Sequence, residues 1–300
     1  MARRPHSPLV AFLVGVLGIA LFSGMDAVMK GLVLAIGAYT TIFWRNLTGV
    51  FLSGPLYLPK RKGWPSRSTM RIHIARGVLS SGMGFLFFWG LGRVPLAQAI
   101  ALAFIAPLIA LYLAAVLLHE KVGARTVGAS LIAFAGVVII FIGQAQADLG
   151  REALIGSFAV LTSAALYALN IIIMRRQALV ADPLEITFFQ SVIVTIVLAL
   201  VIPLAGISVP PLAQWPWLLF AAALAIASML LLSWAYARAE ASYLAATEYT
   251  SFLWAALFGW IFFDESVSPY TLAGACMIVA GCLLAARRPR EASPVLEAAT

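Results

Sequence analysis

The chain has 300 residues, of which 63% are hydrophobic and 11% are charged, and its mean hydropathy is +0.99. A soluble domain of this length could not bury so much apolar surface, and so few charges could not keep the rest in solution. The composition therefore excludes a soluble protein and predicts an integral membrane protein, although the formal net charge is +8.

Apolar stretches long enough to cross a bilayer, which takes about 20 helical residues, follow one another along the chain. Alternation of apolar and polar residues over about ten positions, which is typical of an outer-membrane barrel, does not occur. We therefore predict an all-α polytopic membrane protein with ten transmembrane helices, at residues 8–29, 36–57, 72–91, 95–117, 125–142, 153–174, 184–206, 214–236, 242–262 and 269–286.

The first predicted helix looks like a secretory signal, because Arg3 and Arg4 precede its apolar run. The residues that follow this run, SGMDAVMK, contain no small-x-small cleavage site. We therefore expect this segment to stay in the protein as an uncleaved first helix.

The basic residues are distributed unevenly between the loops. If both termini lie in the cytoplasm, 15 of the 20 Lys and Arg residues fall on the cytoplasmic side and 3 fall outside, with Arg45 and Arg76 within spans. Such asymmetry is the positive-inside signal of membrane proteins. We expect a multi-pass protein of a bacterial-type inner membrane with cytoplasmic termini, and no nucleic-acid partner.

The segment VLLHEKV at 116–122 is similar to the segment IFFDESV at 261–267, which lies 145 residues later. At the same offset Trp89 matches Trp234, and Arg93 matches Arg238. Helices one to five then correspond to helices six to ten, with no element left over. We predict one transmembrane domain made of two five-helix repeats, at 1–145 and 146–290, and a short cytoplasmic tail at 291–300.

Because each repeat has an odd number of spans, the second repeat enters the membrane with the opposite orientation to the first. Glu120 and its counterpart Glu265 are therefore expected on opposite sides of the membrane. Inverted repeats are an architecture of secondary transporters, in which two pseudo-symmetric halves expose a midplane site to either side in turn.

The segments FSGMDAVMKGLVLAIGAYTTIFWRNL and PLAQAIALAFIAPLIALYLAAVLLHEKV resemble the drug/metabolite transporter superfamily. Within it, they are similar to the EamA-type ten-helix branch, which includes aromatic amino-acid exporters, and the similarity covers essentially the whole chain. The resemblance implies export of small metabolites through a central cavity lined by helices 3, 4, 8 and 9 with helices 1 and 6. One departure is Phe252, which stands where the first repeat has Pro107, so the sequence supports a helix kink only in the first half.

Charged side chains deep in a span cost roughly 2.5–3.5 kcal/mol each on insertion scales, so each one is a candidate for function. Asp26 and Arg45 fall at similar depth in the first two helices. We expect a salt bridge between them, acting either as a structural clamp or as a gate that contacts a substrate carboxylate. Lys30 competes for Asp26 at helical spacing, and Arg76 is expected to extend its side chain to the cytoplasmic surface.

The ninth predicted helix carries a stripe of small residues that is interrupted by an acid. One face of this helix holds Leu244, Glu248, Ser251, Ala255 and Gly259. The matching positions of the first repeat are all alanine, at Ala99, Ala103, Ala106, Ala110 and Ala114. Small residues favour close helix packing, but such packing would bury the acid unpaired. We therefore expect Glu248 to face an aqueous cavity, where it binds a substrate ammonium group or carries a proton.

Two aromatic residues of the same helix, Tyr249 and Trp254, lie too centrally to belong to an interfacial aromatic belt. Polar groups in other spans, which either contact a ligand or bond to a neighbouring helix, complete the candidate substrate site. Its members are Glu248, Tyr249, Ser251, Trp254, Gln98, Tyr167 and Asn170.

No metal, cofactor or catalytic residue is expected. His6, His73 and His119 lie at a terminus or near a cytoplasmic edge, and the motifs H-E-x-x-H, G-x-S-x-G and G-x-x-x-x-G-K do not occur. Cys276 and Cys282 are about 9 Å apart along one helix, which is too far for a disulfide.

The sequence thus predicts a secondary transporter that exports amino acids, aromatic and other small zwitterionic ones, by alternating access. Its expected partners are the small-molecule substrate and the lipid bilayer, with protons as a further candidate. A carrier of nucleotide-like or other amphiphilic metabolites is the alternative within this class. A membrane-embedded enzyme is the alternative from another class, and it would convert a solute without moving it.

Overall fold

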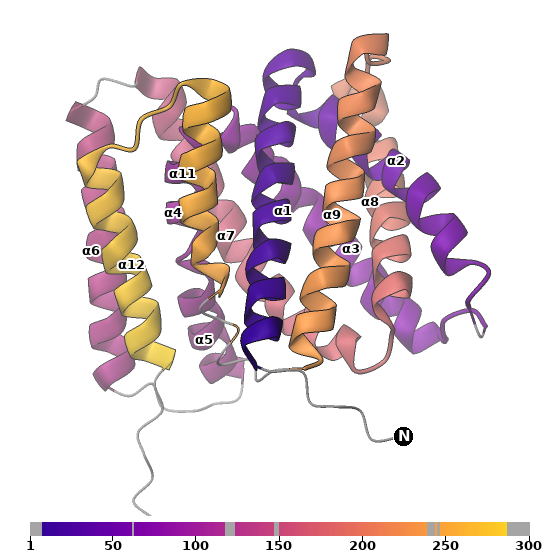
Figure 1. The fold of residues 1–300 in the computed structure, drawn as a ribbon, viewed down its shortest axis with the longest axis horizontal. Helices are drawn as coiled ribbons and strands as arrows, with labels where there is room; N and C mark the ends of the chain where they lie inside the picture. Colours follow the sequence, from indigo (N-terminus) through magenta and orange to yellow (C-terminus); the bar gives the residue numbers. More distant parts are fainter. Residues whose placement is uncertain are drawn as a thin grey trace, which may run out of the picture.

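The computed structural model describes residues 8–61, 63–117, 124–146, 150–238, 244 and 247–286. The regular structure in these ranges is entirely helical (Figure 1). Its elements are α1 (Pro8–Ile36), α2 (Ala38–Tyr57), α3 (Arg67–Leu91), α4 (Leu96–Ala103), α5 (Ala106–Leu117), α6 (Ala124–Gln146), α7 (Gly150–Ala178), α8 (Pro183–Ala205), the 3-10 helix η1 (Leu212–Gln214), α9 (Trp215–Tyr236), α11 (Thr250–Phe263) and α12 (Pro269–Ala286). Glu120 lies outside the described residues.

Several of these helices have the length and composition of membrane spans. Within the described ranges, six segments are long and apolar enough: Leu9–Ile36, Arg67–Leu91, Val127–Gln146, Gly150–Ala178, Pro183–Ala205 and Leu212–Tyr236. Large apolar side chains such as Leu13, Leu131 and Leu200 remain exposed along them. Lipid contact explains that exposure, because exposed apolar side chains are stable against the hydrocarbon core of a bilayer but unfavourable in water.

Helix boundaries repeat at the offset found in the sequence. Helix α3 begins at Arg67 and ends at Leu91, and its counterpart, which is η1 followed directly by α9, begins at Leu212 and ends at Tyr236, each 145 residues later. Helix α2 begins at Ala38, and α8 begins 145 residues later at Pro183. The two halves therefore have the same succession of helices, which confirms the predicted fold class.

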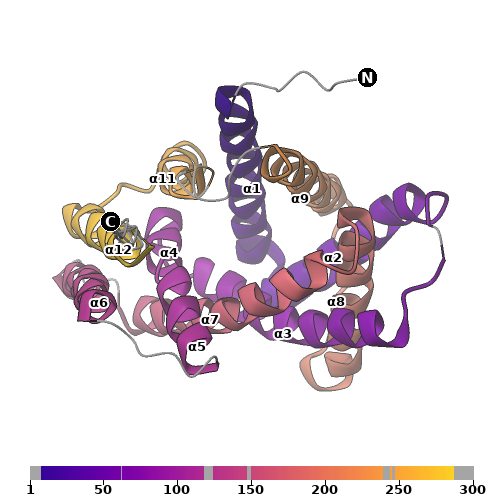
Figure 2. The ribbon, with the colours of Figure 1, turned by 90° about the horizontal axis from the view of Figure 1, so that it is seen from below.

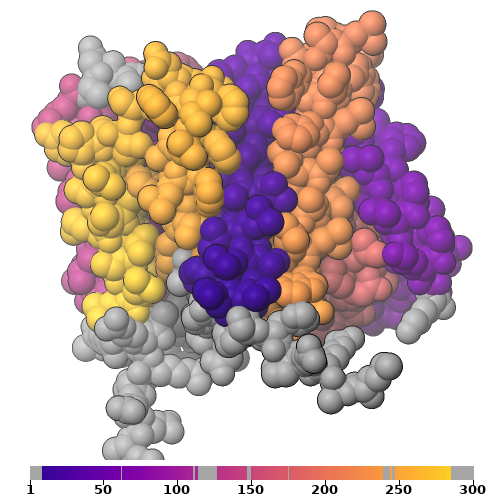
Figure 3. Space-filling view, in the orientation of Figure 1, coloured from indigo at the N-terminus to yellow at the C-terminus, as the bar shows by residue number. Residues whose placement is uncertain are grey.

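Contacts between the two halves are reciprocal. The first helix α1 packs on α9 as its counterpart α7 packs on α3, while α2 contacts its own counterpart α8, and α6 contacts α12. Figure 3 shows α12, α11, α1 and α9 in a row on one face. Seen along the helices in Figure 2, α6 and α12 lie at one end of the molecule and α2 and α8 at the other. The helices α1, α3, α4, α7, α9 and α11 lie between these ends.

Matching residues of the two repeats also make matching local contacts. The guanidinium of Arg93 lies 3.5 Å from the ring centroid of Trp89, and that of Arg238 lies 4.1 Å from the ring centroid of Trp234. Each arginine donates a hydrogen bond to the carbonyl of its tryptophan, at 3.0 and 3.1 Å. The repeat therefore extends to the arrangement of side chains.

Glycines allow α6 and α12 to approach closely. A Cβ atom added to Gly136 would lie 2.6 Å from the carbonyl oxygen of Gly274, and one added to Gly274 would lie 2.5 Å from that of Gly136. At the symmetric position, a Cβ atom added to Gly281 would lie 2.6 Å from the carbonyl oxygen of Ala129. Close backbone approach through small residues is the usual means of helix association in membranes.

Both halves contain a helix break at matching positions. In the first half α4 ends at Ala103, residues Phe104 and Ile105 form a turn, and α5 begins with Pro107 in its first turn. In the second half Tyr249 forms the turn and α11 begins at Thr250. The sequence supports only the first break, because proline explains it. The second break occurs without a proline, so the expectation of a kink in one half alone is wrong.

Candidate functional site

Glu248, the acid that replaces alanine in the second repeat, lies directly before the break at Tyr249. Its side chain is exposed, and its Oε1 accepts a hydrogen bond of 2.8 Å from the hydroxyl of Tyr236 on α9. Tyr167 of α7 and Tyr249 both interact electrostatically with Glu248. A carboxylate next to the break thus bonds to one tyrosine and interacts electrostatically with two others.

The local structure explains the exposure of this acid. Ser251 donates a 2.6 Å hydrogen bond to the carbonyl oxygen of Glu248, which satisfies the backbone where the helix is interrupted. The ring of Tyr249 contacts Phe104, with centroids 5.5 Å apart. Of the predicted substrate contacts, Ser251 therefore bonds to backbone, whereas Glu248 keeps a carboxylate oxygen without a hydrogen bond to a described residue.

Trp254, one turn further along α11, carries an unused donor. Its ring is partly buried and lies against Phe258, with centroids 6.1 Å apart. The indole Nε1 is buried and has no hydrogen-bond partner among the described residues. A buried donor without a partner costs about 1–3 kcal/mol, so an acceptor supplied by a bound molecule would be favoured there.

Arg76 of α3 interacts electrostatically with Tyr167, the tyrosine that also interacts with Glu248. Its Nε donates to Oδ1 of Asn170 at 3.3 Å, and its Nη1 donates to Oε1 of Gln177. Both acceptors are on α7. The side chain is therefore held inside the helix bundle, and the expected extension of Arg76 to the surface is not observed.

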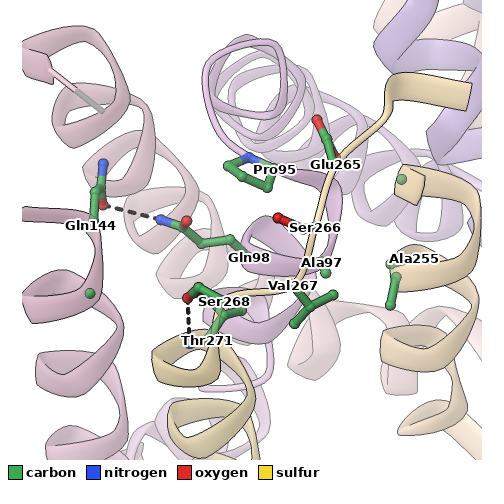
Figure 4. Close-up of a pocket in the computed structure, with 13 residues that line it drawn as sticks. Pro95, Ala97, Gln98, Gln144, Ala255, Glu265, Ser266, Val267, Ser268 and Thr271 are labelled. Carbon is green, nitrogen blue, oxygen red and sulfur yellow. Dashed lines mark hydrogen bonds between the residues drawn. The ribbon is translucent and has the colours of Figure 1, made fainter. Parts of the chain in front are cut away.

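Gln98 occupies a different place from the other candidates. Its amide donates to Gln144 at 3.1 Å and to Ser157 at 3.2 Å, and Ser157 donates to Gln144 at 2.9 Å. Figure 4 shows Gln98 and Gln144 of this cluster beside a cavity at the ends of α4, α6, α11 and α12, which has a volume of about 230 Å³. The structure therefore brings together Glu248, Tyr249 and Tyr167, and places Gln98 in a separate buried cluster.

Lys30 has a partner that helical spacing does not indicate. Its ammonium group forms an ion pair with Glu265 and donates to the carbonyl of Val94 at 2.6 Å. The other carboxylate oxygen of Glu265 accepts a 2.7 Å hydrogen bond from the backbone N–H of Leu96, at the start of α4. Asp26 is thus not the partner of Lys30. Glu265 of the segment IFFDESV therefore connects α1, α4 and the end of α11.

Asp26 and Arg45 do not form a salt bridge within 4.0 Å in the described structure, although they interact electrostatically. Asp26 is only 2% exposed, and its Oδ1 has no hydrogen-bond partner among described residues. The Nε of Arg45 is buried and also without a partner there, while its Nη1 lies 3.5 Å from Oδ1 of Asn46. The expected contact is absent from this conformation, and the gate remains a hypothesis.

Comparison with known proteins identifies the fold. Residues 9–142 and 154–287 each match the EamA-like transporter family, and the two matches are offset by 145 residues. The chain belongs to the EamA-like transporter family. This family is part of the drug/metabolite transporter superfamily, so the predicted resemblance is confirmed, and the protein is a transporter and not an enzyme.

Characterised members of the EamA-like family align with nearly the whole chain. The pseudopaline exporter CntI of Pseudomonas aeruginosa UCBPP-PA14 is 26% identical over 278 residues, which cover 92% of this chain and 95% of that protein. A riboflavin transporter of Rhizobium johnstonii is 29% identical over 301 residues, covering 98% and 97%. A solved crystal structure superimposes with a TM-score of 0.60 at 20% identity, covering 93% of this chain and 98% of the other, and this likeness concerns the fold alone.

The prediction of an EamA-type transporter of small metabolites is thus confirmed, as is a multi-pass location in the membrane. The described residues contain no group of three His, Cys, Asp or Glu side chains that could hold a metal ion. Sequence reasoning missed Gln177 and did not connect it with Arg76 and His73. A signal was available, since polar residues at these positions match apolar residues in the other repeat.

Proposed function

We propose that this transporter exports amino acids and similar small metabolites that carry an ammonium group and an aromatic or apolar part. The observation that carries the proposal is the exposed Glu248 carboxylate at a helix break, which accepts a hydrogen bond from Tyr236 and interacts electrostatically with Tyr167 and Tyr249. A carboxylate binds an ammonium group through a charge-assisted hydrogen bond. Tyrosine faces attract both cations and aromatic rings.

The asymmetry of the repeat supports a role for Glu248 in function. Ala103, the matching residue of the first repeat, lies at the end of α4 directly before the matching break. The fold therefore forms this break with alanine, and an acid is not needed to make it. Because a carboxylate within a membrane span is costly, its presence here is better explained by a ligand or a proton than by packing.

The second candidate cargo is a larger aromatic metabolite, of the size of a flavin. The similarity to a riboflavin transporter across almost the whole chain supports this alternative, and so does the partly exposed Tyr167, of which 39% is accessible. A flavin would use the aromatic rings and the unused indole donor of Trp254. It has no ammonium group, so Glu248 would matter less for its transport.

We propose that the face of the molecule containing Pro8 and Ala178 is cytoplasmic, as the distribution of basic residues indicates. The Lys30–Glu265 ion pair would then hold the external ends of α1, α4 and α11 together. In this arrangement the helix breaks and Glu248 belong to a cavity that receives cargo from the cytoplasm.

The test is efflux from proteoliposomes loaded with labelled L-phenylalanine, L-lysine or riboflavin. We expect the wild-type protein to release L-phenylalanine unchanged, and the Glu248→Ala variant to release it at least about tenfold more slowly, the loss expected for one charge-assisted hydrogen bond. Riboflavin efflux that does not depend on Glu248, without amino-acid efflux, would establish the alternative. Efflux of neither class would reject both cargo assignments.

A further inference from the structure

A chain of hydrogen bonds connects Arg76 to the N-terminal end of α8. Gln177 of α7 lies between Arg76 and His73, and its amide nitrogen lies 2.6 Å from Nδ1 of the histidine. Nε2 of His73 lies 3.0 Å from Oε1 of Glu185, in the first turn of α8. Together with Asn170, the second acceptor of Arg76, these residues form what we call the Arg76 network: Arg76, Asn170, Gln177, His73 and Glu185.

The direction of every bond in this chain follows from Arg76. A guanidinium group can only donate, so Gln177 must turn its carbonyl oxygen toward Arg76 and its NH₂ group toward His73. The Nδ1 atom of His73 must then accept, which places the ring proton on Nε2, where it is donated to Glu185. Each residue from Arg76 to Glu185 therefore donates to the next, and His73 is neutral in this arrangement.

A protonated His73 is incompatible with the bond between Gln177 and Arg76. Protonation would add a hydrogen to Nδ1, which then faces the NH₂ group of Gln177, so two donors would oppose each other. Rotating the amide would satisfy His73 but would turn the NH₂ group toward Arg76, again donor against donor. Cationic His73 and Arg76 thus compete for the single carbonyl oxygen of Gln177.

The repeat indicates that the fold does not require this network. Four of the five matching residues are apolar and buried in one hydrophobic cluster, Leu218 for His73, Ala221 for Arg76, Leu32 for Gln177 and Met25 for Asn170, whereas Glu185 matches the polar Thr40. These four positions of the same helix arrangement are therefore packed with hydrocarbon in one half and with hydrogen-bonded polar groups in the other. Buried polar groups in a membrane protein are costly, and a role in transport explains why this half has them.

We propose that Arg76 binds an anionic group of the cargo, such as a carboxylate, and that the charge of His73 determines when it can do so. A proton taken up at Nδ1 of His73 draws the carbonyl of Gln177 away from Arg76 and frees part of the guanidinium. Because the coupling is reciprocal, an anion that attracts Arg76 also favours protonation of His73. The inference rests on the proposed cavity, in which Tyr167 lies near both Arg76 and Glu248.

Other charged and titratable groups also act on His73. Within the described residues they come from the helices packed around it and one adjoining loop: Arg76 on its own helix, Glu185 and Asp182 on α8 and at its N-cap, Tyr57 on α2, whose hydroxyl lies beside Glu185, and Arg61 after α2. Any test must separate the electrostatic effect of these groups from the competition for the carbonyl oxygen of Gln177.

Nuclear magnetic resonance of protein labelled with ¹⁵N-histidine, in lipid nanodiscs, measures the pH at which His73 changes charge. Signals of His73 are identified by their loss in His73→Leu, which reproduces the matching Leu218. Gln177→Glu replaces the contested amide with a carboxylate that accepts from both neighbours, so we expect the midpoint of His73 to rise by about one pH unit or more. Asn170→Asp adds the same charge next to Arg76 but away from Nδ1, so its shift should be much smaller. Equal shifts in both variants would overturn the competition for Gln177.

A second measurement follows Arg76 itself and does not depend on the Gln177 variant folding. The guanidinium protons of Arg76 exchange with water faster when their bond to Gln177 is lost. At pH 5.5 we expect faster exchange in the wild type than in His73→Leu, and at pH 8 we expect equal rates. Equal rates at both values would show that His73 does not control Arg76. Neither measurement requires transport, so the control of Arg76 by His73 is tested separately from the proposed cargo.

Discussion

Phe104 and Tyr249 occupy the same position in the two repeats, and their rings contact each other with centroids 5.5 Å apart. Each residue lies at the helix break of its own half. Residues related by an approximate two-fold axis can touch only near that axis, so the axis passes close to this contact. The two breaks therefore meet at the centre of the molecule, where inverted-repeat transporters bind their cargo.

The position of Glu248 next to this contact leads to the first prediction. Glu248→Ala should give the second break the residue that the first break already has at Ala103, so we expect the melting temperature to stay close to that of the wild type. Transport should fall, because the cargo loses its carboxylate contact. Thermal melting and proteoliposome efflux of the same preparation measure both quantities.

Glu248→Gln separates two roles of the same acid, since it keeps a hydrogen-bonding side chain but cannot take up a proton. Efflux that Glu248→Gln retains and Glu248→Ala loses would indicate a hydrogen-bonding contact, whereas loss in both would indicate charge. Normal efflux in both variants would reject a functional role. Misfolding of Glu248→Ala alone would make the residue structural.

Hydropathy and the repeat were sufficient to predict the helices, because both signals come from whole stretches of sequence and do not depend on which side chains meet in the fold. The membrane solvent requires each span to be apolar over about 20 residues, and a duplication leaves the same boundaries 145 residues apart. The break at Tyr249 was not predictable in this way. It has no proline, and it depends on packing against Phe104, which only the folded chain provides.

Side-chain partners were harder to predict than helices. Lys30 and Asp26 are four residues apart, and helical spacing made them neighbours, but Lys30 pairs with Glu265, which is 235 residues away. Sequence spacing reports only contacts within one helix. The repeat did single out both residues of this ion pair, since Lys30 matches Arg175 and Glu265 matches Glu120, although it did not bring them together.

The Lys30–Glu265 ion pair should contribute strongly to stability. Lys30 is 3% exposed, and Lys30→Met would leave the partly buried Glu265 with only the N–H of Leu96. We expect the free energy of unfolding to fall by about 3 kcal/mol, near the lower end for a broken buried pair. The control is Glu152→Gln, which removes the partner of Arg93 in an exposed pair and should cost about 1 kcal/mol or less. Denaturant unfolding of both variants in detergent gives the comparison.

Exchanging the two charges should not restore this stability. A lysine at 265 cannot accept the hydrogen bond from the N–H of Leu96, and a glutamate at 30 cannot donate to the carbonyl of Val94. The double variant Lys30→Glu, Glu265→Lys is therefore expected to be no more stable than Lys30→Met. Recovery to the wild-type value would mean that charge alone matters at this site.

Two glycines of α6 should respond in opposite directions to the same substitution. Gly136→Ala places a methyl group 2.6 Å from the carbonyl oxygen of Gly274, and we expect a loss of about 1–3 kcal/mol from overpacking. Gly128→Ala meets nothing within 4 Å and should be neutral or stabilising, by up to about 1 kcal/mol. Melting temperatures of the two variants test this difference. A loss of equal size in both would indicate that close approach of α6 and α12 is not the cause.

The proposed orientation can be tested by labelling single cysteines in a background without native cysteines. Gly63 follows α2, and Val209, which is 73% exposed, lies between α8 and α9, so the two positions belong to opposite faces. Gly150 would be a poor site, because its φ of 76° strains any other residue. In intact cells an impermeant maleimide should label Val209→Cys but not Gly63→Cys. The reverse pattern would invert the orientation, and labelling of both would contradict the succession of spans.

Asp26 and Arg45 are the buried charges whose role this conformation does not explain. Neither Oδ1 of Asp26 nor Nε of Arg45 has a hydrogen-bond partner among the described residues, and each such group costs about 1–3 kcal/mol or more. If the two residues pair in another conformation of the transport cycle, their attraction would favour that conformation over this one. Their coupling should then be larger in transport than in melting.

A double-mutant cycle with Asp26→Asn and Arg45→Gln tests this expectation. In melting experiments, which report this conformation, the coupling should be smaller than in efflux experiments, because no ion pair within 4.0 Å joins the two side chains and only their electrostatic interaction remains. We expect Asp26→Asn to raise the melting temperature, because it removes an unpaired buried charge. In efflux experiments the double variant should be no worse than the worse single variant, because either change alone already breaks the pair. Coupling in melting as large as in efflux would mean that the residues pair in the conformation described here, and additive losses in efflux would mean that they do not pair in any conformation on the transport cycle.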